Sequence, residues 1–183
     1  MFFGLVLVLG CPSGPREPAS LIDHGAWQDA DADPWAAERP DASFLRCDPL
    51  AVYEEAFGSD DTLSVNLDYC NYVSLRQPSL VEVLAGDLLT FRLWHDGLFF
   101  STDEPPHLAL QIGAAPSWEV LLEAPGDSGL EYLQWTAQDD IAVGTPVSFL
   151  VNTHREIDDA RHGGNSLNLI ELSRVDPAWE PAR

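Results

Sequence analysis

The chain has 183 residues, of which 45% are hydrophobic and 10% aromatic, a composition that suits a globular protein with one packed domain. Its 30 acidic residues outnumber its nine basic residues, all of them arginine, and the formal net charge is −21. Nucleic-acid backbones are bound by clusters of Lys and Arg, so this composition excludes a nucleic-acid partner. The absence of lysine also excludes Schiff-base catalysis.

The first ten residues are predicted to be a signal peptide. Residues 2–9 form an apolar run of the right length for its hydrophobic core, too short to span a bilayer as a helix. The run ends in Val8-Leu9-Gly10-Cys11, which resembles the lipobox of bacterial lipoproteins, where the peptide is cut before a cysteine that carries the lipid. The resemblance implies a lipidated Cys11 and a location outside the cytoplasm, at the outer membrane or cell surface.

Residues 11–46 have the composition of an acidic tether. They are rich in Pro, Ala and Asp and contain few aliphatic residues. Trp27, Trp35 and Phe44 are unusual in a pure linker, and they suggest that part of this segment docks onto the domain that follows. A disordered tether and a partly docked one therefore both stay open.

Cys47 and Cys70 remain once Cys11 is assigned to a lipid. In an oxidising compartment, two remaining cysteines favour one structural disulfide. A metal-binding or catalytic thiol is less favoured, because neither cysteine has a CxxC partner or a nearby histidine.

Residues 47–175 are predicted to form an all-β domain, followed by a tail over residues 176–183. Short apolar segments alternate with turn residues, as in Leu89, Phe91 and Leu93, which share one face of a strand and leave Trp94 on the other. About seven or eight such strands indicate a β-sandwich, either immunoglobulin-like or a jelly roll. Strands are expected over residues 63–69, 88–94, 107–112, 118–122, 147–151 and 166–172, and one short helix over residues 48–57.

Histidines suggest a metal site. His154, Asp158 and His162 are spaced four residues apart in a long polar segment between two expected strands, and a helical turn would place them on one face. Two imidazoles and a carboxylate can hold Zn²⁺ or Fe²⁺. His95 and His107 lie at strand ends, which a sandwich gathers at its poles. The sequence thus leaves open either no cofactor or a divalent metal ion.

A β-sandwich with histidines at one pole resembles the copper-binding cupredoxins, and Ala85-Gly86-Asp87 before a strand is similar to theirs. A blue-copper site needs a cysteine ligand in the C-terminal half, and no cysteine follows Cys70. A blue-copper protein is therefore excluded, whereas a histidine site without a thiolate is not.

Six tryptophans and four tyrosines suggest carbohydrate binding, because flat aromatic faces stack on sugar rings. Trp94, Trp118 and Trp135 are the candidate ligand-binding residues. Tryptophan in small domains usually packs in the core instead, so this function requires rings exposed on a common face.

The chain contains neither a Gly-x-Ser-x-Gly elbow nor an HExxH motif. No catalytic residue is assigned, and a role without catalysis is favoured. The order of Cys70-Asn71-Tyr72, Ala85-Gly86-Asp87, Trp94-His95 and Gly164-Asn165-Ser166 is similar to that in a group of bacterial lipoproteins with no assigned activity. That resemblance covers most of residues 47–172 and implies no reaction.

The sequence therefore predicts a lipid-anchored, disulfide-bonded β-sandwich of the bacterial cell envelope, with a binding or structural role. Its expected partners are the membrane, through the lipid, and a polysaccharide or an envelope protein. The alternative is a metal-binding protein or a metal-dependent enzyme that uses the histidines at one pole.

Overall fold

The computed structural model describes residues 14–58, 60–100, 102, 104–155 and 165–179, and every regular element within them is a β-strand. In this described part of the chain, no helix is long and apolar enough to cross a membrane. Two short strands come first, β1 (Ala19–Ser20) and β2 (Gln28–Asp29). The longer strands are β3 (Val52–Phe57), β4 (Asp60–Asn66), β5 (Tyr72–Pro78), β6 (Leu88–His95), β7 (His107–Ile112), β8 (Ala115–Leu121), β9 (Gly129–Thr136), β10 (Pro146–Asn152) and β11 (Ser166–Val175).

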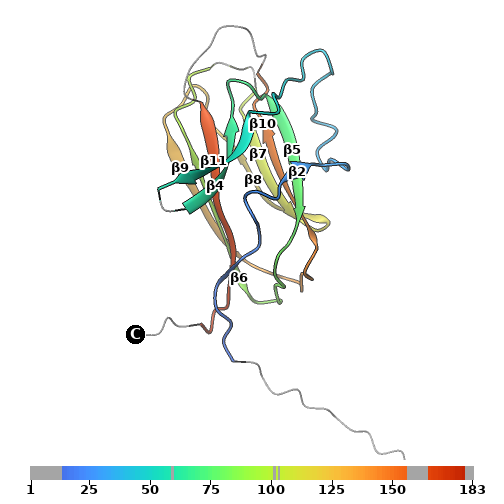
Figure 1. The fold of residues 1–183 in the computed structure, drawn as a ribbon, viewed down its shortest axis with the longest axis vertical. Coiled ribbons are helices and arrows are strands. Elements are labelled where there is room, and N and C mark those ends of the chain that lie inside the picture. Colours follow the sequence, from blue (N-terminus) through green and yellow to red (C-terminus); the bar gives the residue numbers. More distant parts are fainter. Residues whose placement is uncertain (1–13, 59, 101, 103, 156–164, 180–183) are drawn as a thin grey trace, which may run out of the picture.

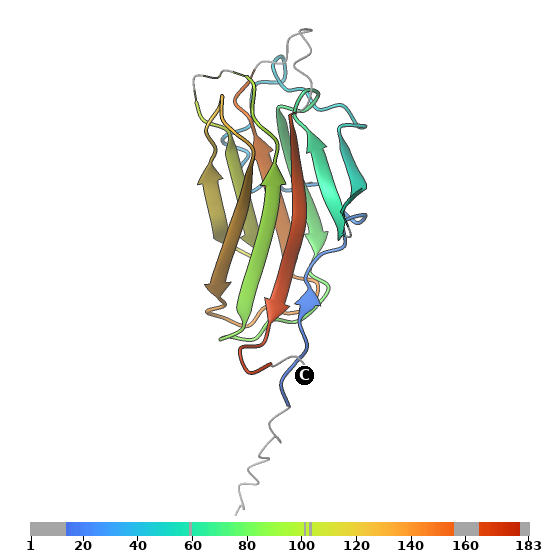
Figure 2. The same ribbon diagram turned by 90° about the vertical axis from the view of Figure 1, so that its left-hand side faces the viewer.

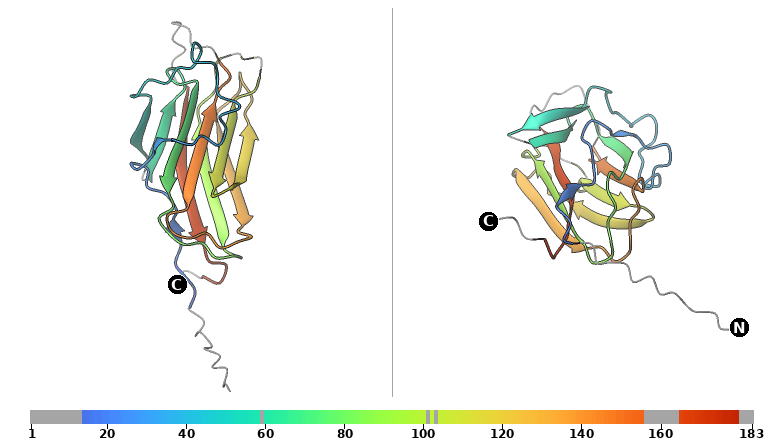
Figure 3. Two further views of the ribbon diagram at one scale, coloured as in Figure 1. Left: turned by 90° about the vertical axis from the view of Figure 1, so that its right-hand side faces the viewer. Right: turned by 60° about the horizontal axis from the view of Figure 1, so that its bottom comes forward.

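The strands form two antiparallel sheets packed face to face (Figures 1 and 3). The six-stranded sheet has the order β3-β4-β11-β6-β9, with β1 paired to β11, and Figure 2 shows its outer surface. The five-stranded sheet has the order β2-β5-β10-β7-β8. The pairs β7–β8, β6–β9, β5–β10 and β4–β11 are nested in one another, which is the connectivity of a jelly roll. The predicted β-sandwich is confirmed, and of its two predicted topologies the chain adopts the jelly roll.

Period-two alternation builds the core between the sheets. On β6, Leu89, Phe91 and Leu93 are at most 1% exposed, whereas Arg92 and Trp94 face outward. Phe149 on β10 meets them from the five-stranded sheet and is 1% exposed. Full burial of each such side chain stabilises the fold by about 1.5–3 kcal/mol.

The short helix predicted over residues 48–57 is wrong. Asp48 begins a turn, in which its side chain accepts a hydrogen bond from the backbone N–H of Leu50, and β3 follows. β3 pairs with β4 over its whole length. The ladder places the neighbouring Glu54 and Glu55 on opposite sides of the sheet, so an adjacent acidic pair is compatible with an edge strand.

Residues 14–46 are docked on the sandwich rather than free of it. Leu21 is fully buried in the main core, and the ring of Trp27 lies 6.3 Å from that of Phe149. Trp35 is 8% exposed and belongs to a second, small core on the outer surface of the five-stranded sheet, together with Tyr72, Ala109 and Leu150. Phe44 remains 50% exposed. Cys11 lies outside the described residues.

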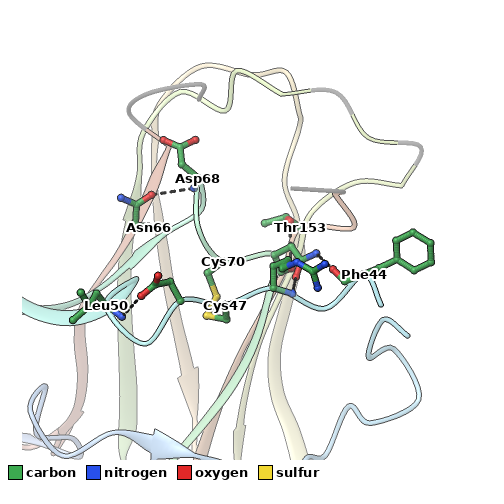
Figure 4. Close-up of a disulfide and its surroundings, with 10 residues drawn as sticks. Phe44, Cys47, Leu50, Asn66, Asp68, Cys70 and Thr153 are labelled. Atoms are coloured by element: carbon green, nitrogen blue, oxygen red, sulfur yellow. Dashed lines mark hydrogen bonds between the residues drawn. A yellow bond between two sulfur atoms is a disulfide. The ribbon is translucent and has the colours of Figure 1, made fainter. Parts of the chain in front are cut away.

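A disulfide joins Cys47 and Cys70, as predicted (Figure 4). It ties the segment before β3 to the turn between β4 and β5, with 3.9 Å between the two Cα atoms. The side chain of Asn71 secures the same place, because its amide accepts a hydrogen bond from the N–H of Arg46 and donates to the carbonyl of Phe44. The stretch of chain from Cys47 to Cys70 is therefore closed by the disulfide and by the hydrogen bonds of Asn71.

Candidate functional site

The candidate site is the outer surface of the six-stranded sheet, where strand pairing arranges outward side chains in rows. One row crosses five strands in register and consists of Tyr53, Ser64, Asn168, Trp94 and Leu130. A second row contains Glu171, Arg92 and Tyr132. These eight residues and their outward neighbours Glu55, Phe57, Asp60 and Asp96 are called the outer face below.

The sheet is curved, so that the β3–β4 hairpin and β9 stand forward of β11 and β6 (Figures 1 and 3). A β-bulge contributes to this shape, because the pairing of β11 with β6 shifts register between Leu169 and Glu171. β11 also changes its partner here, from β4 to β1. The two edges of the outer face, at the β3–β4 hairpin and at β9, therefore project beyond its middle strands, β11 and β6.

His24 fills the place where β11 changes partner. Its Nδ1 accepts a hydrogen bond from the N–H of Leu63 at 3.1 Å, and the ring also hydrogen-bonds the backbone of Ile170. Burial lowers the pKa of His24 below its ordinary value, against the raising effects of the Ile170 bond and of nearby carboxylates. The docked N-terminal segment thus supplies a neutral imidazole to the backbone of β4 and β11 beside the bulge.

Aromatic rings lie along the outer face. Tyr53 and Phe57 are each 39% exposed and Tyr132 is 54% exposed. Trp94 is half-buried; its ring centroid lies 6.1 Å from that of Phe57, and its Nε1 donates to Asp96 at 3.3 Å. Large apolar groups left exposed beside one another mark surfaces used for binding. Contacts with Phe57 and Asp96 hold the indole in one orientation.

Between the rings, polar side chains form a hydrogen-bonded floor. The Ser64 hydroxyl lies within hydrogen-bond distance of two acceptors, Oδ1 of Asn168 at 2.6 Å and the Glu55 carboxylate. The Ser166 hydroxyl donates to Asp96 and accepts a bond from the Asn168 amide at 3.4 Å. Ser64 is 0% exposed and Asn168 is 3% exposed, although they point away from the core. The floor is therefore recessed and rigid.

Arg92 is the cation of the outer face. Its Nε donates to Glu171 at 2.5 Å, and its guanidinium lies 3.5 Å from the Asp60 carboxylate. The Arg92 side chain is 37% exposed, so it still presents N–H donors to solvent. Burial, followed by the charges of Glu55 and Asp96, raises the pKa of Tyr53 above its ordinary value. The Tyr53 phenol consequently stays protonated and can donate.

Of the three tryptophans predicted to bind a ligand, only Trp94 lies on the outer face. Trp118 packs inside the sandwich with its ring centroid 4.5 Å from that of Phe91, and Trp135 also packs against the main core. Their placement gives no support to a ligand-binding role for these two rings. The exposed aromatic residues of the outer face are instead two tyrosines and a phenylalanine.

Two of the histidines predicted to bind a metal share a pocket. His107 and His154 line a pocket of about 700 Å³ together with Glu38, Glu104 and Glu119. Nδ1 of His107 lies 2.7 Å from the Glu38 carboxylate, and Nδ1 of His154 lies 3.3 Å from that of Glu104. Each imidazole therefore faces a carboxylate at the same pole.

His95 lies apart from that pocket, on the six-stranded sheet, with its Nδ1 3.0 Å from the carbonyl oxygen of Asp96. Among the residues that the structure describes, no group of three or more His, Cys, Asp or Glu could hold a metal ion. Asp158 and His162 fall outside these residues. The metal site consequently stays a prediction.

Most residues of the outer face, including Tyr53, Arg92 and Tyr132, are not among the site residues predicted from the sequence. One signal was present in residues 129–136, where Leu130 and Tyr132 alternate with Leu133 and Trp135. Apolar groups on both sides of one strand indicate that its outer side also takes part in packing or binding. The row across five strands leaves no such signal, because it depends on the register of segments far apart in the chain.

No protein-family model matches this chain, and no curated protein matches it. Among solved structures, it is similar to TmCBM61 in complex with beta-1,4-galactotriose, with 14% identity over 86% of this chain and 99% of that one, and a TM-score of 0.43. It is also similar to TmCBM27, a carbohydrate-binding module studied for mannan recognition (10% identity, 88% and 96% coverage, TM-score 0.43). The C-terminal CBM6 of LamC from Zobellia galactanivorans aligns with 11% identity, 69% and 88% coverage and a TM-score of 0.35. All three TM-scores are below 0.5, so these likenesses support no function for this chain.

Proposed function

We propose that the protein is a carbohydrate-binding module of the bacterial cell envelope that holds a polysaccharide chain on the outer face. The observation that carries the proposal is the arrangement of the outer face, where the exposed rings of Tyr53, Phe57 and Tyr132 lie around a recessed polar floor. The sequence leaves both a binding role and a structural role open, and we propose the binding role.

Sugars suit this surface for two physical reasons. A pyranose ring has an apolar C–H face that stacks on aromatic side chains, and Tyr132 on β9 and Trp94 on the adjacent strand β6 lie near each other on the outer face. The same ring carries hydroxyls that donate and accept. The Arg92 guanidinium supplies donors, and the carboxylates of Glu171 and Asp60 supply acceptors around it.

A location outside the cytoplasm is part of the proposal. The Cys47–Cys70 disulfide is typical of oxidising compartments, and the lipobox-like Val8-Leu9-Gly10-Cys11 supports a lipid anchor. The described chain begins at one pole of the sandwich (Figure 1), and near its start the backbone N–H of Arg16 donates a hydrogen bond to Asp176. The six-stranded sheet faces the viewer in Figure 2 and its strands run away from that pole, so an anchor there would leave the outer face open to solvent.

The test is retention of the purified protein on insoluble polysaccharides, such as glucan, mannan and galactan. The wild type is expected to bind at least one of them. The double variant Trp94→Ala/Tyr132→Ala should lose at least tenfold in affinity, since buried apolar surface contributes about 25 cal/mol per Å² and losing about 60 Å² of contact already weakens binding tenfold. Phe44→Ala removes an exposed ring elsewhere and serves as the matched control. Binding to none of the polymers, or equal binding by the double variant, would refute the proposal.

A further inference from the structure

The charges of the outer face restrict what kind of polysaccharide it can hold. Glu55, Asp60, Asp96 and Glu171 contribute carboxylates, and Arg92 is the cation of the outer face. The whole chain reinforces this sign with its net charge of −21. A ligand group near the outer face therefore meets a negative potential.

Arg92 is not free to offset this potential for an anionic ligand. A cation that binds a sugar carboxylate or sulfate would have to give up protein partners, yet Glu171 already receives its Nε–H at 2.5 Å and Asp60 stands 3.5 Å away. Replacing these partners with a ligand carboxylate would leave two protein carboxylates beside a third negative group. Like charges placed together cost free energy, and a ligand that makes no such pair avoids this cost.

The same carboxylates can accept hydrogen bonds from uncharged sugars. A hydroxyl can donate to a carboxylate oxygen, and such charge-assisted bonds are stronger than neutral ones. The protonated Tyr53 phenol adds a donor, and the Arg92 N–H groups that Glu171 does not use add others. The outer face can thus satisfy hydroxyl groups while it repels acidic ones.

On this basis, and resting on the proposed function, we propose that the outer face selects polysaccharides without anionic groups and excludes uronates. The carboxylates of Glu171 and Asp60 are the specificity determinants, because they hold Arg92 in a closed ion pair. Removing both would release the guanidinium for a ligand carboxylate.

The experiment is affinity chromatography of the full chain on columns that carry matched immobilised polymers. β-1,4-Mannan and β-1,4-mannuronan differ at C6, which is a hydroxymethyl in one and a carboxylate in the other, and β-1,4-glucan and β-1,4-glucuronan form a second pair. The wild type should be retarded by a neutral member at least tenfold more strongly than by its acidic partner. The variant Asp60→Asn/Glu171→Gln should gain at least tenfold on the acidic member, with the gain lost in high salt.

Asp139→Asn/Glu82→Gln removes two exposed carboxylates away from the outer face and controls for net charge. This variant should not gain affinity for the uronates. Equal retardation of the wild type by both members of a pair would overturn the charge selection and leave the proposed function intact, whereas no retardation by any polymer would refute the proposed function itself. Glu171→Gln alone repeats the test if the double variant does not fold.

Discussion

Single side chains decide how the outer face is held in place. Asn168 connects Ser64 to Ser166, and Ser166 in turn bonds Asp96, so the floor spans β4, β11 and the end of β6. Buried polar groups that are fully bonded to one another fix one arrangement, whereas a broken member leaves its partners unsatisfied. Side chains that are already held in place lose less conformational entropy when a ligand binds, so the free-energy cost of binding is smaller.

His24 provides a prediction on pH. Its folded-state pKa is lowered, while its unfolded pKa is about 6.5, so the neutral ring stabilises the fold fully above that pH. As pH falls from 7.5 to 5.5, the unfolded chain takes up a proton that the folded chain resists, and stability declines. His24→Gln removes this contribution, and urea unfolding at the two pH values should show a smaller decline than in the wild type. An equal decline would contradict this role.

At the scale of strands, period-two patterns predict well where one side of a strand is strictly apolar. β6, β7, β10 and β11 lie within a few residues of their predicted positions. β9 and β5 were missed because apolar and polar residues occur on both of their sides, and the β3 segment was predicted as a helix. The edge strand β3 is stabilised by pairing with β4, a tertiary contact that outweighs local propensity.

The docking of residues 14–46 was only partly foreseeable. Trp27 and Trp35 indicate docking by their size, but Leu21 and Ile22 enter the main core as an isolated apolar pair in a polar segment. Isolated apolar residues produce no periodicity that a sequence can reveal. On the outer face, the outward orientation of Trp94 could be predicted from its own strand, whereas its neighbours come from β3, β4, β9 and β11.

The disulfide should stabilise the strands that it joins. Cys47 and Cys70 are 23 residues apart, and closing a loop of that size stabilises a protein by about 3 kcal/mol in the chain-entropy model. The variant Cys47→Ser/Cys70→Ser should therefore lose about 3 kcal/mol in urea unfolding. Reduction of the wild type with dithiothreitol should reproduce the loss. An unchanged unfolding midpoint after complete reduction would show that the bridge is not needed.

At the scale of the whole molecule, the proposed lipid anchor on Cys11 can be tested by phase partitioning. Expressed in a bacterium with lipoprotein processing, the wild type should partition into the detergent phase, and its mature N-terminus should carry lipid on Cys11. Cys11→Ser should move the protein to the aqueous phase, while Cys47→Ser/Cys70→Ser should leave the partitioning unchanged. A mature protein that retains an unmodified Met1 in the membrane fraction would contradict lipidation.

The jelly roll gives the molecule two broad surfaces, and they differ in what covers them. The N-terminal segment packs onto the five-stranded sheet through Trp35 and pairs with its edge through β2. The six-stranded sheet keeps exposed rings on its two edge strands, β3 and β9. This difference is why binding is assigned to the outer face.

The most direct test of that assignment is a map of the binding surface by two-dimensional NMR of ¹⁵N-labelled protein titrated with an oligosaccharide of the polymer that binds. We predict that the shifted signals will include the Trp94 indole N–H and amides of β3, β4, β6, β9 and β11. Shifts confined to the five-stranded sheet, or to the pocket beside His107 and His154, would contradict that assignment.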